Sequence, residues 1–123
     1  MNLTNILTSK EIAFKAARLC EDKKGSDTEI LDISNVSDLA DFIVISSGET
    51  SAQLKAMARH VEESLSDLGI EPTVKEGTYG DKWYLLDYGD VIINIIQQEA
   101  RNYYNLEELW QKAHFIPATE WSE

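Results

Sequence analysis

The sequence predicts an α/β fold, a single mixed sheet of about five strands flanked by helices, and three observations support this prediction. Short apolar runs rich in β-branched residues alternate with stretches of helical period from Thr8 to Glu76. The stretch Lys82–Gln97 then has the pattern of two strands folded back on each other. A length of 123 residues suits one domain with one core, and we expect only 1–7 and 117–123 to be flexible ends.

The first predicted elements are a helix and an edge strand. Thr8 and Glu11 have the spacing of a capping box, and apolar residues recur at helical intervals after them until Gly25. Glu29–Ser34 alternates between apolar and polar residues, which is typical of a strand with one side more exposed than the other. We expect this strand to lie at the edge of the sheet.

The middle of the chain has the pattern of a βαβ unit. Phe42–Ile45 is an unbroken apolar run, which is typical of a strand covered on both faces. Thr50 and Gln53 have the spacing of a second capping box, and the helix that they begin ends at Gly69. A further strand at Thr73–Glu76 should run parallel to the first, with a right-handed crossover.

After a predicted turn at Gly77–Gly80, the stretch Lys82–Gln97 forms a β-hairpin. Both arms are rich in β-branched and aromatic residues, and Gly89 can take the positive φ that a two-residue loop requires. If Asp87 and Asp90 flank the loop, each step outward moves one residue along both strands. This register pairs Leu86 with Val91, Leu85 with Ile92, Tyr84 with Ile93 and Trp83 with Asn94.

The two faces of the predicted hairpin differ in composition. One is almost wholly apolar and should be core; it comprises Tyr84, Leu86, Val91, Ile93 and Ile95. The other mixes large apolar groups with carboxylates and an amide, which suits docking of a polar partner, and its predicted partner-binding residues are Trp83, Leu85, Asp87, Asp90, Ile92 and Asn94. Alternatively, helices cover both sides of the sheet and Trp83 is an ordinary core aromatic. This stretch leaves both interpretations open.

The end of the chain is predicted to be helical and then frayed. Glu99–Tyr104 can form a short helical turn. Asn105 and Glu108 have the spacing that opens a last helix, whose apolar side would comprise Leu106, Leu109, Trp110 and Ala113. Pro117 and the acidic end that follows it indicate a frayed tail.

Composition restricts the partners. The formal net charge is −11, from 11 Lys and Arg against 22 Asp and Glu, so a basic protein is a better partner than bare nucleic acid, whose phosphates would be repelled. Cys20 is the single cysteine, which excludes an internal disulfide and fits a small apolar helix residue. The sequence contains no signal-peptide pattern and no long apolar stretch, so we expect a cytoplasmic protein that does not enter membranes.

No residues form a convincing catalytic or metal site. The turn Ser47–Ser51 could present backbone N–H groups to an anion, but it lacks the Lys and the glycine spacing of nucleotide-binding loops, and Glu49 would repel phosphate. His60 and His114 have no histidine or cysteine at ligand spacing and are expected to be solvated. We therefore predict no catalytic residue, no metal and no cofactor.

Three blocks of sequence resemble a known family. They are LDISNVSDLADFIVISSGETSAQ from Leu31 to Gln53, KWYLLDYGDVIINI from Lys82 to Ile95, and YYNLEELW from Tyr103 to Trp110. In this order they are similar to the bacterial ribosomal silencing factors, the Iojap family. The family's typical positions fall on Trp83, on Asp87, Gly89 and Asp90, and on Tyr104, Leu106, Glu107, Leu109 and Trp110. Family members commonly carry histidine at Asn94, so a role for a titratable imidazole is absent here, whereas a hydrogen-bonding role is retained.

The resemblance implies a translational repressor without enzymatic activity. It would bind a basic protein of the large ribosomal subunit at the subunit interface and sterically block joining of the small subunit when nutrients run short. The resemblance also implies a mixed sheet related in topology to nucleotidyltransferases, and often a homodimer. The alternative is a nucleotidyltransferase-like enzyme that binds a nucleotide through Ser47, Gly48 and nearby carboxylates.

Overall fold

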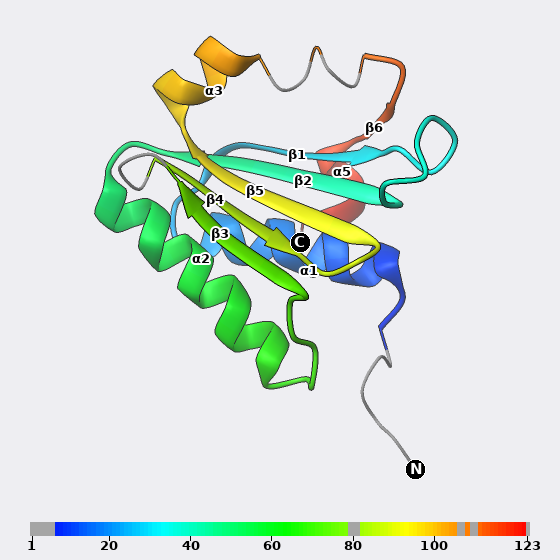
Figure 1. Ribbon diagram of the computed structural model, residues 1–123, viewed down its shortest axis with the longest axis horizontal. Helices are drawn as coiled ribbons and strands as arrows, with labels where there is room; N and C mark the ends of the chain where they lie inside the picture. Colours follow the sequence, from blue (N-terminus) through cyan, green and yellow to red (C-terminus); the bar gives the residue numbers. More distant parts are fainter. Residues whose placement is uncertain (1–6, 79–81, 106–107, 109–110, 123) are drawn as a thin grey trace.

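A computed structural model describes residues 7–78, 82–105, 108 and 111–122 of the chain (Figure 1). These residues form one six-stranded sheet with helices on both sides, one strand more than the sequence predicts. The elements are α1 (Ser9–Asp22), β1 (Ser26–Asp32), β2 (Phe42–Gly48), α2 (Ser51–Ser66), β3 (Val74–Thr78), β4 (Trp83–Asp87), β5 (Val91–Gln97), α3 (Gln98–Tyr104), β6 (His114–Ile116) and α5 (Ala118–Trp121).

The sheet has the strand order β3-β4-β5-β2-β1-β6, and β2 and β5 are its parallel pair. All other neighbouring strands are antiparallel. β3 runs in the same direction as β2, as predicted for the βαβ unit, but β4 and β5 lie between them. The strand at Ser26–Asp32 is not an edge strand, because β6 pairs with its outer side. The prediction missed this because a three-residue strand has too short a pattern to be recognised.

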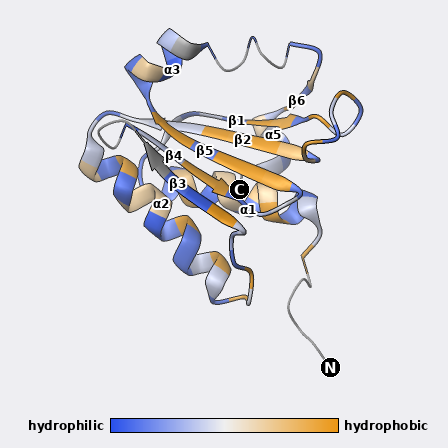
Figure 2. Cartoon of the chain, in the orientation of Figure 1, coloured by the Kyte–Doolittle hydropathy of each residue, from blue (hydrophilic) through white to orange (hydrophobic). Residues whose placement is uncertain are grey.

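Two apolar clusters lie on the two faces of the sheet, and the central strands are correspondingly hydrophobic in Figure 2. α1 and α2 cover one face, which we call the helical face; its hairpin residues are Tyr84, Leu86, Val91, Ile93 and Ile95. α3 lies on the opposite side in Figure 1. This α3 face carries Leu31, Ile43, Ile45, Ile92 and Ile96, with Trp83, Leu85 and Ala100 packed against them.

The helix boundaries agree with the predicted caps. Thr8 and Glu11 form the complete capping box of α1, and the Thr50 hydroxyl accepts the Gln53 N–H at the start of α2. Gly69 follows α2 with φ 80, a conformation that favours glycine. α3 is also confirmed within one residue of its predicted start.

The prediction of a frayed tail is wrong for the described residues 117–122. β6 extends the sheet, and α5 places the Trp121 ring in the core with 2% exposure. The Arg18 guanidinium donates to the Trp121 carbonyl over 3.0 Å, which ties α5 to α1. Burial of one aromatic ring outweighs the polar composition that indicated disorder. Residues 79–80 of the predicted turn, and Leu106, Leu109 and Trp110 of the predicted last helix, lie outside the described residues; Gly77 and Thr78 belong to β3.

Candidate partner-binding site

The hairpin has a different register from the one predicted, although its two faces are unchanged. Leu86 pairs with Ile93 instead of Val91, and Leu85 pairs with Asn94. The β5 partner of each β4 residue lies two positions further along β5 than predicted. Because side chains alternate between the two faces of a strand with a period of two, every side chain keeps its predicted face. The loop is therefore Gly89-Asp90, and the Tyr88 N–H donates to the Val91 carbonyl over 2.9 Å at its base.

Local interactions explain this loop. Gly89 has φ 89, which satisfies the predicted need for a positive φ. The Asp87 carboxylate accepts the Gly89 N–H over 2.8 Å, and the Asp90 carbonyl accepts the N–H groups of Asp41 and Phe42. Asp87 and Asp90 thus stabilise the turn and its attachment to β2, while their carboxylates remain at the surface as a half-buried and an exposed group.

The helical face of the hairpin is core, as predicted. Leu86, Val91, Ile93 and Ile95 are at most 2% exposed and pack against the residues of α1 and α2. Burial of each such side chain contributes roughly 1.5–3 kcal/mol of transfer free energy. These four side chains are therefore not accessible to a partner, whereas Tyr84 on the same face is half-buried.

The α3 face divides the predicted binding residues into an accessible and a buried group. Trp83, Leu85 and Asp87 are half-buried on β4. Ile92 and Asn94 on the neighbouring β5 are only 7% exposed, so the expectation that they lie open beside Trp83 is wrong. β5 lies between β4 and β2 and is covered more fully than β4, which is nearer the edge of the sheet.

Trp83 and Asn94 interact directly. The indole N–H of Trp83 donates to the side-chain carbonyl of Asn94 over 2.9 Å. In the register, Asn94 is opposite Leu85 and Trp83 is opposite Ile96, so the bond is diagonal across the two strands. Trp83 also packs on the apolar cluster of the α3 face. Trp83 is therefore packed on this cluster while remaining partly accessible, and its role in partner binding stays a prediction.

Two exposed residues that were not among the predicted site residues belong to elements beside this surface, β3 and α3. Val74 on β3 is opposite Asp87 and is 42% exposed. Tyr103 on α3 is 82% exposed, whereas Ala100 of the same helix packs on the α3 face. Helical periodicity does not identify Tyr103 as exposed, because positions three residues apart, such as 100 and 103, lie near the same side of a helix. The accessible surface that we call the docking patch is Val74, Trp83, Leu85, Asp87 and Tyr103.

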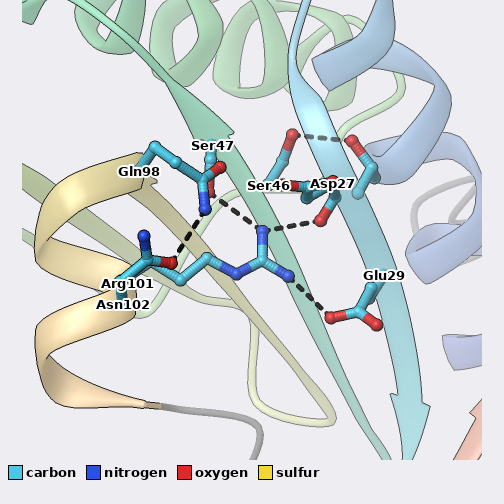
Figure 3. Close-up of polar contacts among 8 residues, drawn as sticks. Asp27, Glu29, Ser46, Ser47, Gln98, Arg101 and Asn102 are labelled. Atoms are coloured by element: carbon cyan, nitrogen blue, oxygen red, sulfur yellow. Dashed lines mark hydrogen bonds and ion pairs between the residues drawn. The ribbon is translucent and has the colours of Figure 1, made fainter.

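Arg101 is a buried cation that the sequence interpretation missed. It is 2% exposed, and its guanidinium donates to groups on β1 and β2 (Figure 3). One guanidinium nitrogen donates to the Asp27 carbonyl (2.6 Å) and to the Ser47 hydroxyl (2.9 Å). The other donates to the Glu29 carboxylate (2.6 Å). Asp27 has φ 49 beside an irregularity in the β1–β2 register, which is a conformation that aspartate tolerates and that directs its carbonyl at the guanidinium.

The position of Arg101 is informative about ligand binding. β2 continues into α2 on the helical face, whereas β5 continues into α3 on the other face (Figure 1). Ligands of α/β proteins commonly bind where adjacent parallel strands diverge in this way. Here the Arg101 guanidinium donates to the Ser47 hydroxyl near the end of β2, and Ser46 and Ser47 are 0% exposed. The serine of the alternative enzyme hypothesis is thus already engaged by an internal cation.

The strand-to-helix turn is also satisfied by the chain's own side chains. The Thr50 hydroxyl accepts the Gln53 N–H (3.1 Å), and the Gln53 side-chain carbonyl accepts the Glu49 N–H (2.8 Å). The Gln53 amide donates in turn to the carbonyls of Lys23 and Lys24. The reciprocal bond of the predicted capping box therefore goes to Glu49 instead of Thr50. These bonds give the turn a structural role at the start of α2.

Thr50→Ala should lower the free energy of unfolding by about 1 kcal/mol, because the Gln53 N–H loses its acceptor. Urea unfolding monitored by circular dichroism measures this change. Thr50→Ser keeps the hydroxyl and should restore most of the loss. A Thr50→Ala protein with unchanged stability and a lost binding activity would instead make this turn part of a functional site.

The single cysteine and the two histidines do not form a reactive site in the described structure. Burial raises the pKa of the Cys20 thiol to about 12, with the Ser46 hydroxyl acting in the opposite direction, so the thiol is protonated and inaccessible at neutral pH. The His60 ring lies 3.2 Å from an Asp22 carboxylate oxygen, and His114 is exposed on β6. Among the described residues, no three His, Cys, Asp or Glu side chains are grouped to hold a metal. None of the described helices combines the length and the apolar composition that a membrane span requires.

A family model and related sequences match most of the chain and agree on one family. The family model described as "Ribosomal silencing factor during starvation" matches residues 6–123. The ribosomal silencing factor of Bacillus subtilis is 36% identical over 107 residues, which are 87% of this chain and 91% of that protein. The mouse protein "Mitochondrial assembly of ribosomal large subunit protein 1" is 35% identical over 78 residues, which are 61% of this chain and 34% of its own length.

A solved structure supports the fold directly. A crystal structure of a protein from Chromobacterium violaceum superposes with a TM-score of 0.81 at 32% identity. The superposition covers 85% of this chain and 88% of the other. The fold is therefore shared, over most of its length, with an experimental structure of related sequence.

Proposed function

Because the chain belongs to the ribosomal silencing factor family, and so has a ribosome-associated silencing role, we propose that it binds the large ribosomal subunit and blocks joining of the small subunit. The relatives are named as silencing factors and not as enzymes, which suggests a protein that acts by binding. One relative is named for assembly of the large ribosomal subunit, which favours that subunit as the partner. Ribosomes would place the site of action in the cytoplasm.

The docking patch is the observation that carries this proposal. It combines an accessible aromatic surface at Trp83 and Tyr103 with apolar Val74 and Leu85 beside the Asp87 carboxylate. Aromatic residues provide much of the binding energy in protein interfaces, and carboxylates at the border guide a basic partner into register. With a net charge of −11, the whole chain attracts a basic ribosomal protein and repels exposed RNA.

The proposed mechanism is steric exclusion and needs no chemical step. A domain bound at the face that the small subunit approaches prevents joining as long as it stays bound. Its efficiency depends on affinity and lifetime relative to the rate of subunit joining. The engaged Ser47 and the satisfied turn at Thr50 give no support to the alternative, a nucleotide-binding enzyme.

The test of this function is binding to separated subunits followed by a joining assay. The protein should sediment with isolated large subunits and not with small ones. Large subunits incubated with it should then form fewer complete ribosomes when small subunits are added. Equal sedimentation with both subunits, or an unchanged yield of complete ribosomes at saturating protein, would refute the proposal.

A pair of charge variants tests whether the docking patch is the binding surface. Val74→Arg places a positive charge in the patch, whereas Ala56→Arg makes the same charge change on the exposed surface of α2. Val74→Arg should weaken binding to large subunits about tenfold or more, because a like charge opposes a basic partner and apolar contact is lost. Ala56→Arg should bind almost as the unmodified chain does. Equal losses in the two variants would mean that only net charge matters and that the patch is elsewhere.

A further inference from the structure

Asn94 has an unusual environment for a residue on a candidate binding face. It is one of the few buried polar side chains of the described residues, with 7% exposure. Its neighbours in the register are Leu85 on β4 and Ile45 on β2. A partner protein therefore meets little of its surface. Its side-chain carbonyl is instead used inside the protein, where it accepts the Trp83 indole N–H over 2.9 Å.

We propose that Asn94 is a positioning residue that fixes the Trp83 ring in the orientation needed for partner binding, without contacting the partner itself. The inference rests on the proposed function, since it takes Trp83 to be part of the docking patch. It assigns to Asn94 a role different from direct contact. The two residues would act as one unit, with Trp83 as the contact and Asn94 as its support.

The chemistry of the two side chains makes this bond suited to orientation. An indole has a single N–H donor and no acceptor, so only one edge of the ring can satisfy an acceptor. The Asn94 carbonyl lies on β5 between apolar neighbours, including Ile92 and Ile96 on the same face. A buried donor without an acceptor is costly, so loss of the carbonyl would favour rotation of the indole toward water. An already oriented ring would not have to be ordered when the partner binds.

The geometry of the sheet explains why Asn94 can perform this task. Trp83 is the first residue of β4, and its direct neighbour in the register is Ile96. Asn94 is two residues away on the same face of β5, at the diagonal position that a long aromatic side chain can reach. The bond therefore draws the indole along β4 toward Leu85 and over the apolar cluster of the α3 face, where Trp83 packs.

The experiment is a double-mutant cycle with a spectroscopic reporter. Asn94→Leu removes the acceptor at similar volume, and Trp83→Phe removes the N–H while keeping an aromatic ring. Each single variant should weaken binding to purified large subunits about tenfold, and the double variant should be no weaker than either. Solvent exchange of the Trp83 indole proton, observed by NMR, should accelerate in Asn94→Leu. The indole proton of Trp121, buried beside α1, is the internal reference and should be unchanged.

The possible outcomes separate this inference from the proposed function. Additive losses in the double variant would show that Asn94 contacts the partner directly, which contradicts a positioning role. Unchanged exchange of the Trp83 indole proton in Asn94→Leu would also overturn it. A third outcome is faster exchange of the Trp83 indole proton in Asn94→Leu, with unchanged binding of both Asn94→Leu and Trp83→Phe. This result would confirm the hydrogen bond but remove Trp83 from the interface, so the docking patch itself would be wrong. Thermal melting of each variant excludes unfolding as the cause.

Discussion

Replacing Arg101 with alanine should lower the free energy of unfolding by about 3 kcal/mol, a large effect for one side chain. The substitution removes a guanidinium that is 2% exposed, together with its hydrogen bonds to the Asp27 carbonyl, the Ser47 hydroxyl and the Glu29 carboxylate. Breaking a buried ion pair typically costs roughly 3–5 kcal/mol. The Glu29 side chain is 34% exposed and can regain some hydration, which places the expected value at the lower end.

The measurement is urea unfolding of Arg101→Ala beside two companion variants. Arg101→Lys keeps the charge but has a single ammonium group, which cannot reproduce a planar fork that reaches three acceptors, so it should recover only part of the loss. Arg59→Ala removes the same kind of side chain from the exposed surface of α2 and should change stability by no more than about 0.5 kcal/mol. Equal stabilities of Arg101→Ala and Arg59→Ala would mean that the buried network contributes nothing.

Leu86→Ala and Trp83→Ala should have opposite consequences, although both residues lie on β4. Leu86 is 2% exposed on the helical face, and its truncation should cost roughly 2–5 kcal/mol of stability through lost burial and a cavity. Binding should fall only as far as the domain unfolds. Trp83 is half-buried on the α3 face, so its truncation should reduce stability less. Removing a central aromatic contact should cost at least ~2 kcal/mol of binding, about a thirtyfold loss of affinity.

Two measurements on both variants test the assignment of Leu86 to the core and Trp83 to the interface. The first is thermal melting, and the second is binding to large subunits at a temperature where both variants are folded. If Trp83→Ala melts as low as Leu86→Ala and binds normally at the lower temperature, Trp83 is a core residue only. The binding surface would then have to be sought on another part of the chain, beginning with the acidic outer surface of α2.

Local patterns predicted most of the fold because they depend on nearby residues. The capping residues Thr8 and Thr50, the end of α2 at Gly69 and the two faces of the hairpin all follow from short-range chemistry. The register of the hairpin was wrong because Asp87 serves the loop from inside the strand, a choice that depends on one hydrogen bond to Gly89. Alternation along the strands survived this error, since a displacement by two residues preserves the faces.

The missed features depend on residues far apart in the chain. In the sequence, Arg101 is indistinguishable from an ordinary surface cation. Its burial depends on the folded chain, which brings the Asp27 carbonyl of β1 and the Ser47 hydroxyl of β2 within hydrogen-bonding distance. β6 has only three residues and is identified as a strand in the structure by its pairing with the outer side of β1. The burial of Asn94 follows from the coverage of β5 by its neighbours, which no period-two pattern reveals. Sequence patterns predicted the two faces of the hairpin, and tertiary packing decides which side chains of the α3 face are accessible.

The order of strands in the sheet has a consequence for how the chain folds as it is synthesised. The central parallel pair joins Phe42 to Val91, about 50 residues later, and the outer pair joins Ile30 to Ile116, close to the end of the chain. Contacts of such long range cannot form until the later strand has left the ribosomal exit tunnel. α1 and α2 emerge early, but the strands that they cover are incomplete until β5 follows. The nascent chain therefore completes its sheet only after residues 114–116 have been synthesised and have left the tunnel.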